Sequence, residues 1–158
     1  KIGNQVWMAE NLNYETENSY CYDDDPANCE KYGRLYTWDA ALNACPSGWH
    51  LPTAEEFATL ISNVGGEEGA AIMLKSTTGW YEDGHGVDKY GFNVLPAGYR
   101  SNLGRFDIAG KYAYFWSATE CTEDYANLLG LLYSHEDALL GNLIKYDAYS
   151  VRCLRGSN

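Results

Sequence analysis

Apolar residues recur at helical spacing in the first third of the chain. Between residues 37 and 45 they fall at i, i+3, i+4 and i+7, on one face of a helix: Trp38, Ala41, Leu42 and Cys45. Pro46 cannot continue a helix, so the pattern ends there. We therefore expect a helix over residues 37–45, with Cys45 facing the interior.

A second helix is predicted soon afterwards. Thr53 and Glu56 have the spacing of a capping box, and Gly65 and Gly66 mark the end of the pattern. The apolar positions between them are again helical: Phe57, Leu60, Ile61 and Val64. Glu55 and Glu56 fall in the first turn, where carboxylates interact favourably with free backbone N–H groups. We interpret this pair as structural rather than catalytic.

The remainder of the chain reads as one short helix and several short strands. The helix is expected at residues 67–75. Strand patterns between Gly, Asn and Asp turns occur at residues 5–8, 91–100, 112–119 and 150–155. Helices early and strands late indicate an α+β fold in a single domain, residues 1–158. We expect two main helices packed on short twisted antiparallel strands, and a long loop-rich C-terminal half.

Composition narrows the range of partners. The 14 Tyr, 5 Trp, 4 Phe and 16 Gly of this 158-residue chain suit short strands and ordered loops. The net charge of -11 comes with no basic cluster, so nucleic acid is not an expected partner. No apolar run reaches the ~18 residues of a membrane span, and we expect no membrane insertion by this domain.

Five cysteines are many for a chain of this size: Cys21, Cys29, Cys45, Cys121 and Cys153. None forms a Cys-x-x-Cys pair of the kind that binds zinc. We expect two disulfides and one odd thiol, formed in an oxidising compartment. Cys153 shares one face of the last strand with Val151, and a bridge from an inward-facing Cys45 to Cys153 fits that arrangement.

Several motifs together resemble the C-type lectin fold. They are YTWDAALNAC at residues 36–45, GWHL at 48–51, the Glu-rich capped helix, FWS at 115–117 and VRC at 151–153. In that fold a helix cysteine pairs with a cysteine of the last strand, so the resemblance also implies the Cys45–Cys153 bridge.

A closer resemblance, over nearly the whole chain, is to the Fibrobacter succinogenes major paralogous domain. It rests on IGNQVWMAENL (residues 2–12), CYDDDPANC (21–29), YGRLYTW (32–38), CPSGWHLPT (45–53) and SVRCL (150–154). The resemblance implies a secreted or surface-attached bacterial protein with no established enzymatic activity. It also implies an N-terminal strand cut short in this sequence. Cys121 departs from the family pattern, which leaves a free thiol, an intermolecular bridge or mispairing open.

One acidic segment is a candidate calcium site. Asp23, Asp24, Asp25 and Asn28 offer hard oxygen ligands inside the short loop that a Cys21–Cys29 bridge would close. Their spacing is not that of a helix-loop-helix calcium site, and acidic turns are usually solvated. No other cofactor is expected.

The segment between residues 116 and 149 is where a C-type lectin fold presents its ligand surface. It combines aromatic rings, which stack on sugar faces, with groups that bind hydroxyls. The candidate ligand-binding residues here are Trp116, Tyr125, Asn127, Tyr133, Glu136, Asp137, Asn142, Tyr146 and Asp147. Trp80 and Tyr81 precede a glycine-rich charged loop that suggests exposure, so we add them as candidate anchors. The alternative is that many of these aromatics fill the core.

The expected function is that of a non-catalytic recognition module, extracellular or on the bacterial cell surface. Its expected ligand is a polysaccharide or glycoconjugate, and the alternative is a protein-binding or adhesion module. We expect a monomer unless Cys121 forms an intermolecular bridge.

More distant resemblances point elsewhere. Residues 150–152 are similar to a motif of retroelement variable proteins, and residues 51–56 resemble the Leu-Pro-Thr-Glu-x-Glu signature of formylglycine-generating enzymes. Those enzymes use two cysteines in their C-terminal half. A bridge from Cys153 to Cys45 would leave only Cys121 there, so enzymatic activity is not expected.

Overall fold

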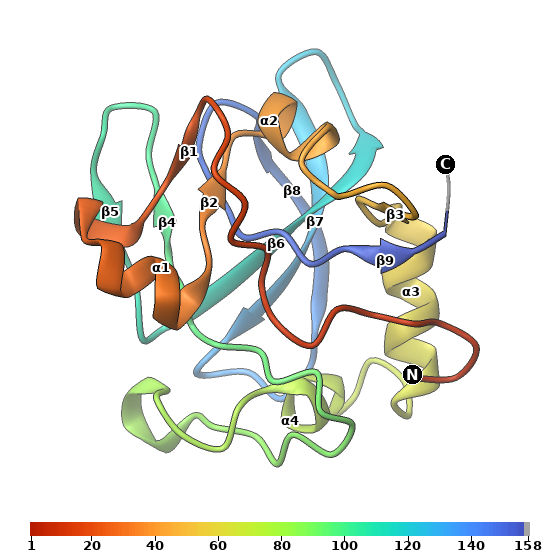
Figure 1. The fold of residues 1–158 in the computed structure, drawn as a ribbon. Helices are drawn as coiled ribbons and strands as arrows, with labels where there is room; N and C mark the ends of the chain where they lie inside the picture. Colours follow the sequence, from red (N-terminus) through yellow and green to blue (C-terminus); the bar gives the residue numbers. More distant parts are fainter. Residues whose placement is uncertain (157–158) are drawn as a thin grey trace.

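A three-stranded antiparallel sheet lies at the centre of the computed structural model, which describes residues 1–156 (Figure 1). Its strands, in spatial order, are β6 (Tyr112–Glu120), β7 (Tyr125–Leu132) and β8 (Leu139–Ile144). In the register of the sheet Phe115 lies opposite Leu129, which lies opposite Leu140. Because β7 is central, β8 is left as an edge strand.

Three small two-stranded sheets flank this centre. They are β1 (Ser19–Tyr20) with β2 (Leu35–Tyr36), β3 (Trp49–His50) with β9 (Leu154–Arg155), and β4 (Tyr99–Arg100) with β5 (Phe106–Asp107). Figure 1 shows the first and last pairs on one side of the central sheet, and β3 and β9 on the other side beside α3. Strands of two residues are not stable by themselves, so tertiary packing holds them in place.

The helices are short and separate. They are α1 (Pro26–Tyr32), α2 (Trp38–Leu42), α3 (Ala54–Asn63) and α4 (Ala70–Leu74), with 3-10 turns η1 (Tyr22–Asp24) and η2 (Tyr81–Asp83). None of the helices in residues 1–156 is long and apolar enough to cross a bilayer.

The largest core cluster lies between α3 and the central sheet. Phe57, Leu60 and Ile61 of α3 share it with Phe115 and Leu129 of the sheet. Thr53 caps α3 by accepting a hydrogen bond from the Glu56 N–H at 3.2 Å, as the capping box predicts. The sequence interpretation of this helix is confirmed.

Other sequence predictions need correction. The helix expected at residues 37–45 ends at Leu42, because Asn43 leaves the helical conformation (φ -117°). The helix expected at residues 67–75 is present only as α4. Residues 5–8 form isolated bridges to Ile2 and Leu154 rather than a strand. The C-terminal half contains β6, β7 and β8, and long segments without helix or named strand lie there as well, such as residues 84–98 and 145–153. The coarser α+β prediction is confirmed.

Two disulfides fasten the fold. Cys45–Cys153 spans 108 residues of sequence, and Cys21–Cys29 spans 8. Both pairings expected from the sequence are confirmed, and Cys121 is an exposed free thiol. Intramolecular disulfides of this kind are typical of secreted and extracellular proteins.

Candidate functional site

A polar cleft of about 370 Å³ opens at one end of the molecule, where segments distant in sequence meet. It lies near the first residues of α2, the end of β1, and the loops that follow β4, β6 and β8. Its lining residues are Asn18, Tyr20, Thr37, Asp39, Arg100, Asn102, Glu123, Lys145 and Tyr146. Two aromatic rings therefore face the same space as cations, amides and carboxylates.

Backbone hydrogen bonds hold these segments together. The Thr37 N–H donates to the Asn18 carbonyl at 3.2 Å, which fixes β1 beside the start of α2. The Trp38 N–H donates to the Lys145 carbonyl at 3.1 Å, which brings in the segment after β8. Arg100 and Ala148 exchange two such bonds, at 3.1 and 2.8 Å. The cleft is thus built by main-chain pairing, and its shape does not depend on side chains alone.

Lys145 forms a fixed cationic wall of the cleft. Its ammonium group lies 3.0 Å from a Glu120 carboxylate oxygen and donates to the Glu123 carbonyl at 2.8 Å. It also lies 4.5 Å from the centre of the Trp38 ring. With its side chain only 9% exposed, Lys145 is held in one place and its charge is balanced by Glu120.

Tyr146 contributes an accessible ring to the lining of the cleft. The residue is 52% exposed, and its hydroxyl donates to an Asp124 carboxylate oxygen at 2.8 Å. This hydrogen bond raises the pKa of Tyr146 above its ordinary value of 10, and the negative charge of Asp124 adds to the effect. The bond fixes the hydroxyl, and the half-exposed ring offers a surface on which a ligand can stack.

The candidate residues from the sequence lie in different places. Tyr146 lines the cleft, and Asp147 lies beside it, accepting from the Asn102 N–H at 2.8 Å. Tyr125 is 42% exposed at the same end of the sheet, where it pairs with Ile144. Asn127 and Asn142 face each other across β7 and β8.

The remaining candidates surround the turn between β7 and β8, at the opposite end of the sheet. Glu136 and Asp137 lie in this turn, and the Glu136 carbonyl accepts from the Ala71 N–H at 3.0 Å. Tyr133 packs edge-on against Tyr81, with ring centres 5.3 Å apart. These residues do not join the cleft.

Two tryptophans expected at the surface belong to the core. Trp80 is 5% exposed, and its indole N–H donates to the Ser76 hydroxyl at 3.0 Å. Trp116 is fully buried and donates to the Tyr36 carbonyl at 2.8 Å. The expectation of exposure is therefore wrong for both, because each indole finds its hydrogen-bond partner inside the fold. Tyr81, at 47% exposure, is accessible.

The acidic segment after Cys21 is a helix start, a feature that the sequence reading missed. Asp25 caps α1 by accepting from the Ala27 N–H at 3.0 Å, and Pro26 occupies the first helical position. Asn28 donates to the Tyr22 carbonyl at 2.9 Å. Within residues 1–156 no group of three or more His, Cys, Asp or Glu side chains is arranged to hold a metal ion. Calcium at Asp23, Asp24, Asp25 and Asn28 stays a prediction.

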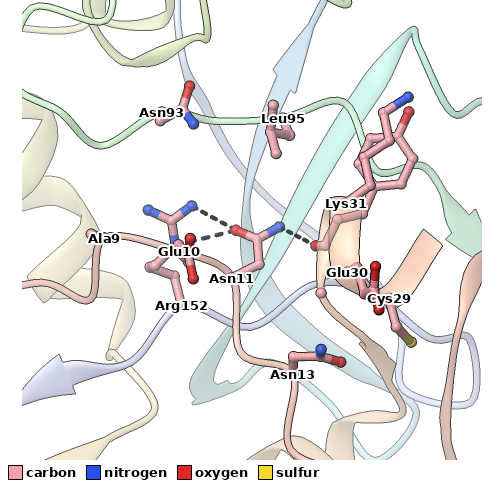
Figure 2. Close-up of a pocket in the computed structure, with 12 residues that line it drawn as sticks. Ala9, Glu10, Asn11, Asn13, Cys29, Glu30, Lys31, Asn93, Leu95 and Arg152 are labelled. Atoms are coloured by element: carbon pink, nitrogen blue, oxygen red, sulfur yellow. Dashed lines mark hydrogen bonds between the residues drawn. The ribbon is translucent and has the colours of Figure 1, made fainter. Parts of the chain in front are cut away.

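A smaller pocket of about 110 Å³ has Arg152 among its twelve lining residues, and the contacts of this arginine are structural (Figure 2). Arg152 is 1% exposed, and its guanidinium donates to the Asn11 side-chain oxygen at 2.6 and 3.2 Å. It also donates to the carbonyls of Met8 and Phe92. Asn11 in turn donates to the Tyr32 carbonyl at 2.8 Å. Arg152 therefore links the N-terminal segment, α1 and the C-terminal segment.

His50 and Glu56 are also framework residues. The His50 Nε2 lies 2.7 Å from a Glu56 carboxylate oxygen, and its Nδ1 lies 2.9 Å from the Gly156 carbonyl oxygen. This chain of contacts joins the start of α3 to the segment after β9. The structural interpretation of Glu56 agrees with this arrangement, although its carboxylate contacts His50 rather than closing the capping box.

Most of the residues that line the cleft were not predicted from the sequence. Apart from Tyr146 its lining residues had no distinguishing motif, because two-residue strands and loops bring them together from both halves of the chain. Its most distinctive feature is Arg100, which has no ion-pair partner and lies beside Tyr20. The sequence does not show this feature, because it depends on the packing of β1 against β4.

Comparison with curated proteins and with solved structures gave no match. Residues 1–155 match the Fibrobacter succinogenes major domain, and the chain belongs to that family.

Proposed function

We propose that this chain is a non-catalytic extracellular recognition module of C-type lectin-like architecture, which binds a polysaccharide or glycoconjugate in the cleft beside Tyr146. The observation that carries the proposal is the exposed Tyr146 ring in the lining of a polar cleft. Rings of this kind stack on the apolar faces of sugars. A volume of about 370 Å³ falls within the usual range of small-ligand clefts.

The polar groups of the cleft suit sugar hydroxyls. Asp39 and Glu123 offer acceptors, while Asn18 and Asn102 offer both donors and acceptors. A hydroxyl group both donates and accepts, so a saccharide satisfies such a mixed lining better than a purely apolar ligand does. The Cys45–Cys153 bridge is the main support for the C-type lectin-like architecture.

A protein-binding or adhesion module is the second candidate, and the edge strand β8 favours it. Leu139 and Leu140 of this strand are 39% and 41% exposed, and the outer edge of β8 pairs with no other strand of the described chain. An extended peptide adds readily to such an edge. Catalysis of the formylglycine-generating type is not proposed. It requires two active cysteines, and four of the five cysteines form the two disulfides, which leaves Cys121 alone.

A glycan array tests the proposal. The purified domain is applied to plant cell-wall, mucin and bacterial glycans, with calcium and with EDTA, and hits are quantified by calorimetry. Tyr146→Ala should weaken binding roughly ten-fold or more, about 1.4 kcal/mol. Tyr90→Ala is the matched control, because Tyr90 is 38% exposed and lies outside the cleft.

The outcomes separate the candidates. Equal binding by wild type and Tyr146→Ala would show that the sugar binds elsewhere. Silence of the folded domain on every glycan would favour a protein partner at β8. Loss of binding in EDTA would support calcium at Asp23 to Asp25.

A further inference from the structure

Arg100 is a cation without a counter-charge, in a chain that has 22 acidic and 11 basic residues. No carboxylate in residues 1–156 forms an ion pair with it. Its Nε is shielded from solvent and has no hydrogen-bond partner within the described part of the chain. A single long bond, 3.5 Å from Nη1 to the Ser101 carbonyl, engages its outer nitrogens. The Nη2 group makes no hydrogen bond within the described part of the chain and is not shut off from solvent, so it is available to a ligand.

The guanidinium is held in position although it is unpaired. It stacks on the Tyr20 ring at 3.9 Å from the ring centre, and Phe106 lies at 5.8 Å. A Cβ atom at Gly104 would lie 3.4 Å from Nη2, at ordinary contact distance, so the loop after β4 lies beside the guanidinium. The backbone of Arg100 is fixed by its paired bonds to Ala148. Stacking occupies the face of the guanidinium and restricts its motion, which lowers the entropy cost of binding.

The surroundings of Arg100 suit a carboxylate better than a phosphate. A guanidinium binds a carboxylate through two parallel hydrogen bonds. Asp39 and Glu123 line the same cleft, and their charges would repel a dianion more than a monoanion. The carboxylates of the same two residues can accept hydrogen bonds from the hydroxyl groups of a ligand. A carboxylate with hydroxyls around it matches both features.

We propose that the ligand of this cleft is an acidic saccharide, whose carboxylate is bound by Arg100 while its ring contacts Tyr146. This inference rests on the proposed glycan-binding function and adds the ligand's charge to it. Hexuronates and sialic acids both carry the required group. Because the chain has a net charge of -11, long polyanions are repelled and short acidic oligosaccharides are the suitable ligands.

Matched pairs of short saccharides test this inference. Trigalacturonate is compared with its methyl ester, and sialyllactose with lactose, by calorimetry on wild type and on Arg100→Gln. The wild type should bind the acid of at least one pair ten-fold or more tightly than its neutral counterpart. The pair that shows this preference identifies the source of the carboxylate. Arg100→Gln should abolish the preference, and Arg100→Lys should retain part of it as a point charge without the paired geometry.

Arg105→Gln is the control, because Arg105 is exposed and lies in the loop between β4 and β5, close to Arg100 in sequence but outside the cleft. It should leave the preference unchanged. If Arg100→Gln does not fold, as judged by circular dichroism, two measurements remain. The wild-type comparison tests the preference for acidic saccharides, and Arg100→Lys tests the role of the guanidinium.

Each contrary outcome is distinct. Equal binding of acidic and neutral saccharides by the wild type would overturn the acidic-ligand inference and leave the glycan-binding proposal standing. A preference that persists in Arg100→Gln would overturn the role of Arg100. No binding of any saccharide by the folded protein would overturn both proposals.

Discussion

Two buried cations show how single residues hold this chain together. Lys75 is 2% exposed and its ammonium donates to the carbonyls of Leu132, at 2.5 Å, and His135, at 2.9 Å. Arg152 is 1% exposed and donates to two carbonyls and to Asn11. Burial lowers the pKa of Lys75 to about 8 and that of Arg152 to about 9. At neutral pH both remain charged, so each is a cationic link between separate backbone segments.

Trp80 is a second example at the scale of single residues. Because it is buried, we expect its replacement to lower the stability of the fold. Trp80→Ala removes a large side chain from the main core cluster and should cost about 3–5 kcal/mol of unfolding free energy. Tyr81→Ala, at its exposed neighbour, should cost about 1 kcal/mol or less. Urea denaturation of the two variants measures the difference. Similar losses in both would contradict the assignment of Trp80 to the core.

At the scale of elements, the sequence was informative where one segment decides its own structure. The α3 helix has its capping residue, its apolar face and its glycine end within 14 residues, and each was recognised. The strand pattern at residues 112–119 is likewise confirmed as β6. In both cases local patterning and tertiary packing favour the same structure.

Elements were missed where the pattern was less distinctive. The β7 sequence YANLLGLL is nearly continuously apolar, because strand residues are buried on both faces of the sheet, so the alternation of a half-buried strand is absent. The start signals of α1, Asp25 and Pro26, were present but were interpreted as a metal-binding loop. The helical spacing of apolar residues continues to Cys45, but α2 itself ends at Leu42.

The two disulfides should contribute unequally to stability. In the chain-entropy model a closed loop of about 100 residues is worth about 4.7 kcal/mol, and a loop of 8 is worth about 2.5. Replacing Cys45 and Cys153 by alanine should therefore lower the unfolding free energy more than replacing Cys21 and Cys29. Urea denaturation of the two double variants tests the order. The reverse order would mean that the Cys21–Cys29 bridge, which holds α1, contributes more to the unfolding free energy than the Cys45–Cys153 bridge.

At the scale of the whole molecule, the cleft illustrates why the site was largely invisible in the sequence. Its walls come from residues 18–20, 37–39, 100–102, 123 and 145–146, which meet only through long-range pairing. Tyr146 was recognised because an exposed aromatic near polar residues is a general binding feature. Arg100 was not, since its lack of a partner is a property of the assembled fold.

Stability should rise with pH before it falls, because buried lysine and tyrosine residues titrate differently from their unfolded forms. The pKa of Lys75 is about 8 in the folded chain and ordinarily 10.5, so between these values the unfolded chain binds more protons and folding gains stability. This term amounts to about 2.5 kcal/mol between pH 7 and pH 10. Burial raises the pKa of Tyr36 and Tyr149 well above 10, so stability falls again above pH 10.

Urea denaturation from pH 7 to pH 11 measures this profile. The Cys121→Ser background is needed, because a free thiolate would exchange with the disulfides at high pH. Lys75→Met should remove the rise that starts near pH 8. A smaller rise should remain from about pH 9, because the pKa of Arg152 is also lowered, from 12.5 to about 9, and the fall at higher pH should be kept. A rise between pH 8 and pH 9 that is unchanged in Lys75→Met would assign the effect to another group.

The long disulfide has a further consequence for a protein that is exposed to proteases. Exposed loop tips are preferred cutting sites, and the loop after β4 has one at Leu103, which is 84% exposed. Because Cys45 and Cys153 are joined, one cut anywhere between residues 46 and 152 leaves a single covalent molecule. A cut at Leu103 would place Arg100 and Asn102 on one fragment and Lys145 and Tyr146 on the other, and the bridge keeps these two parts of the cleft attached until it is reduced.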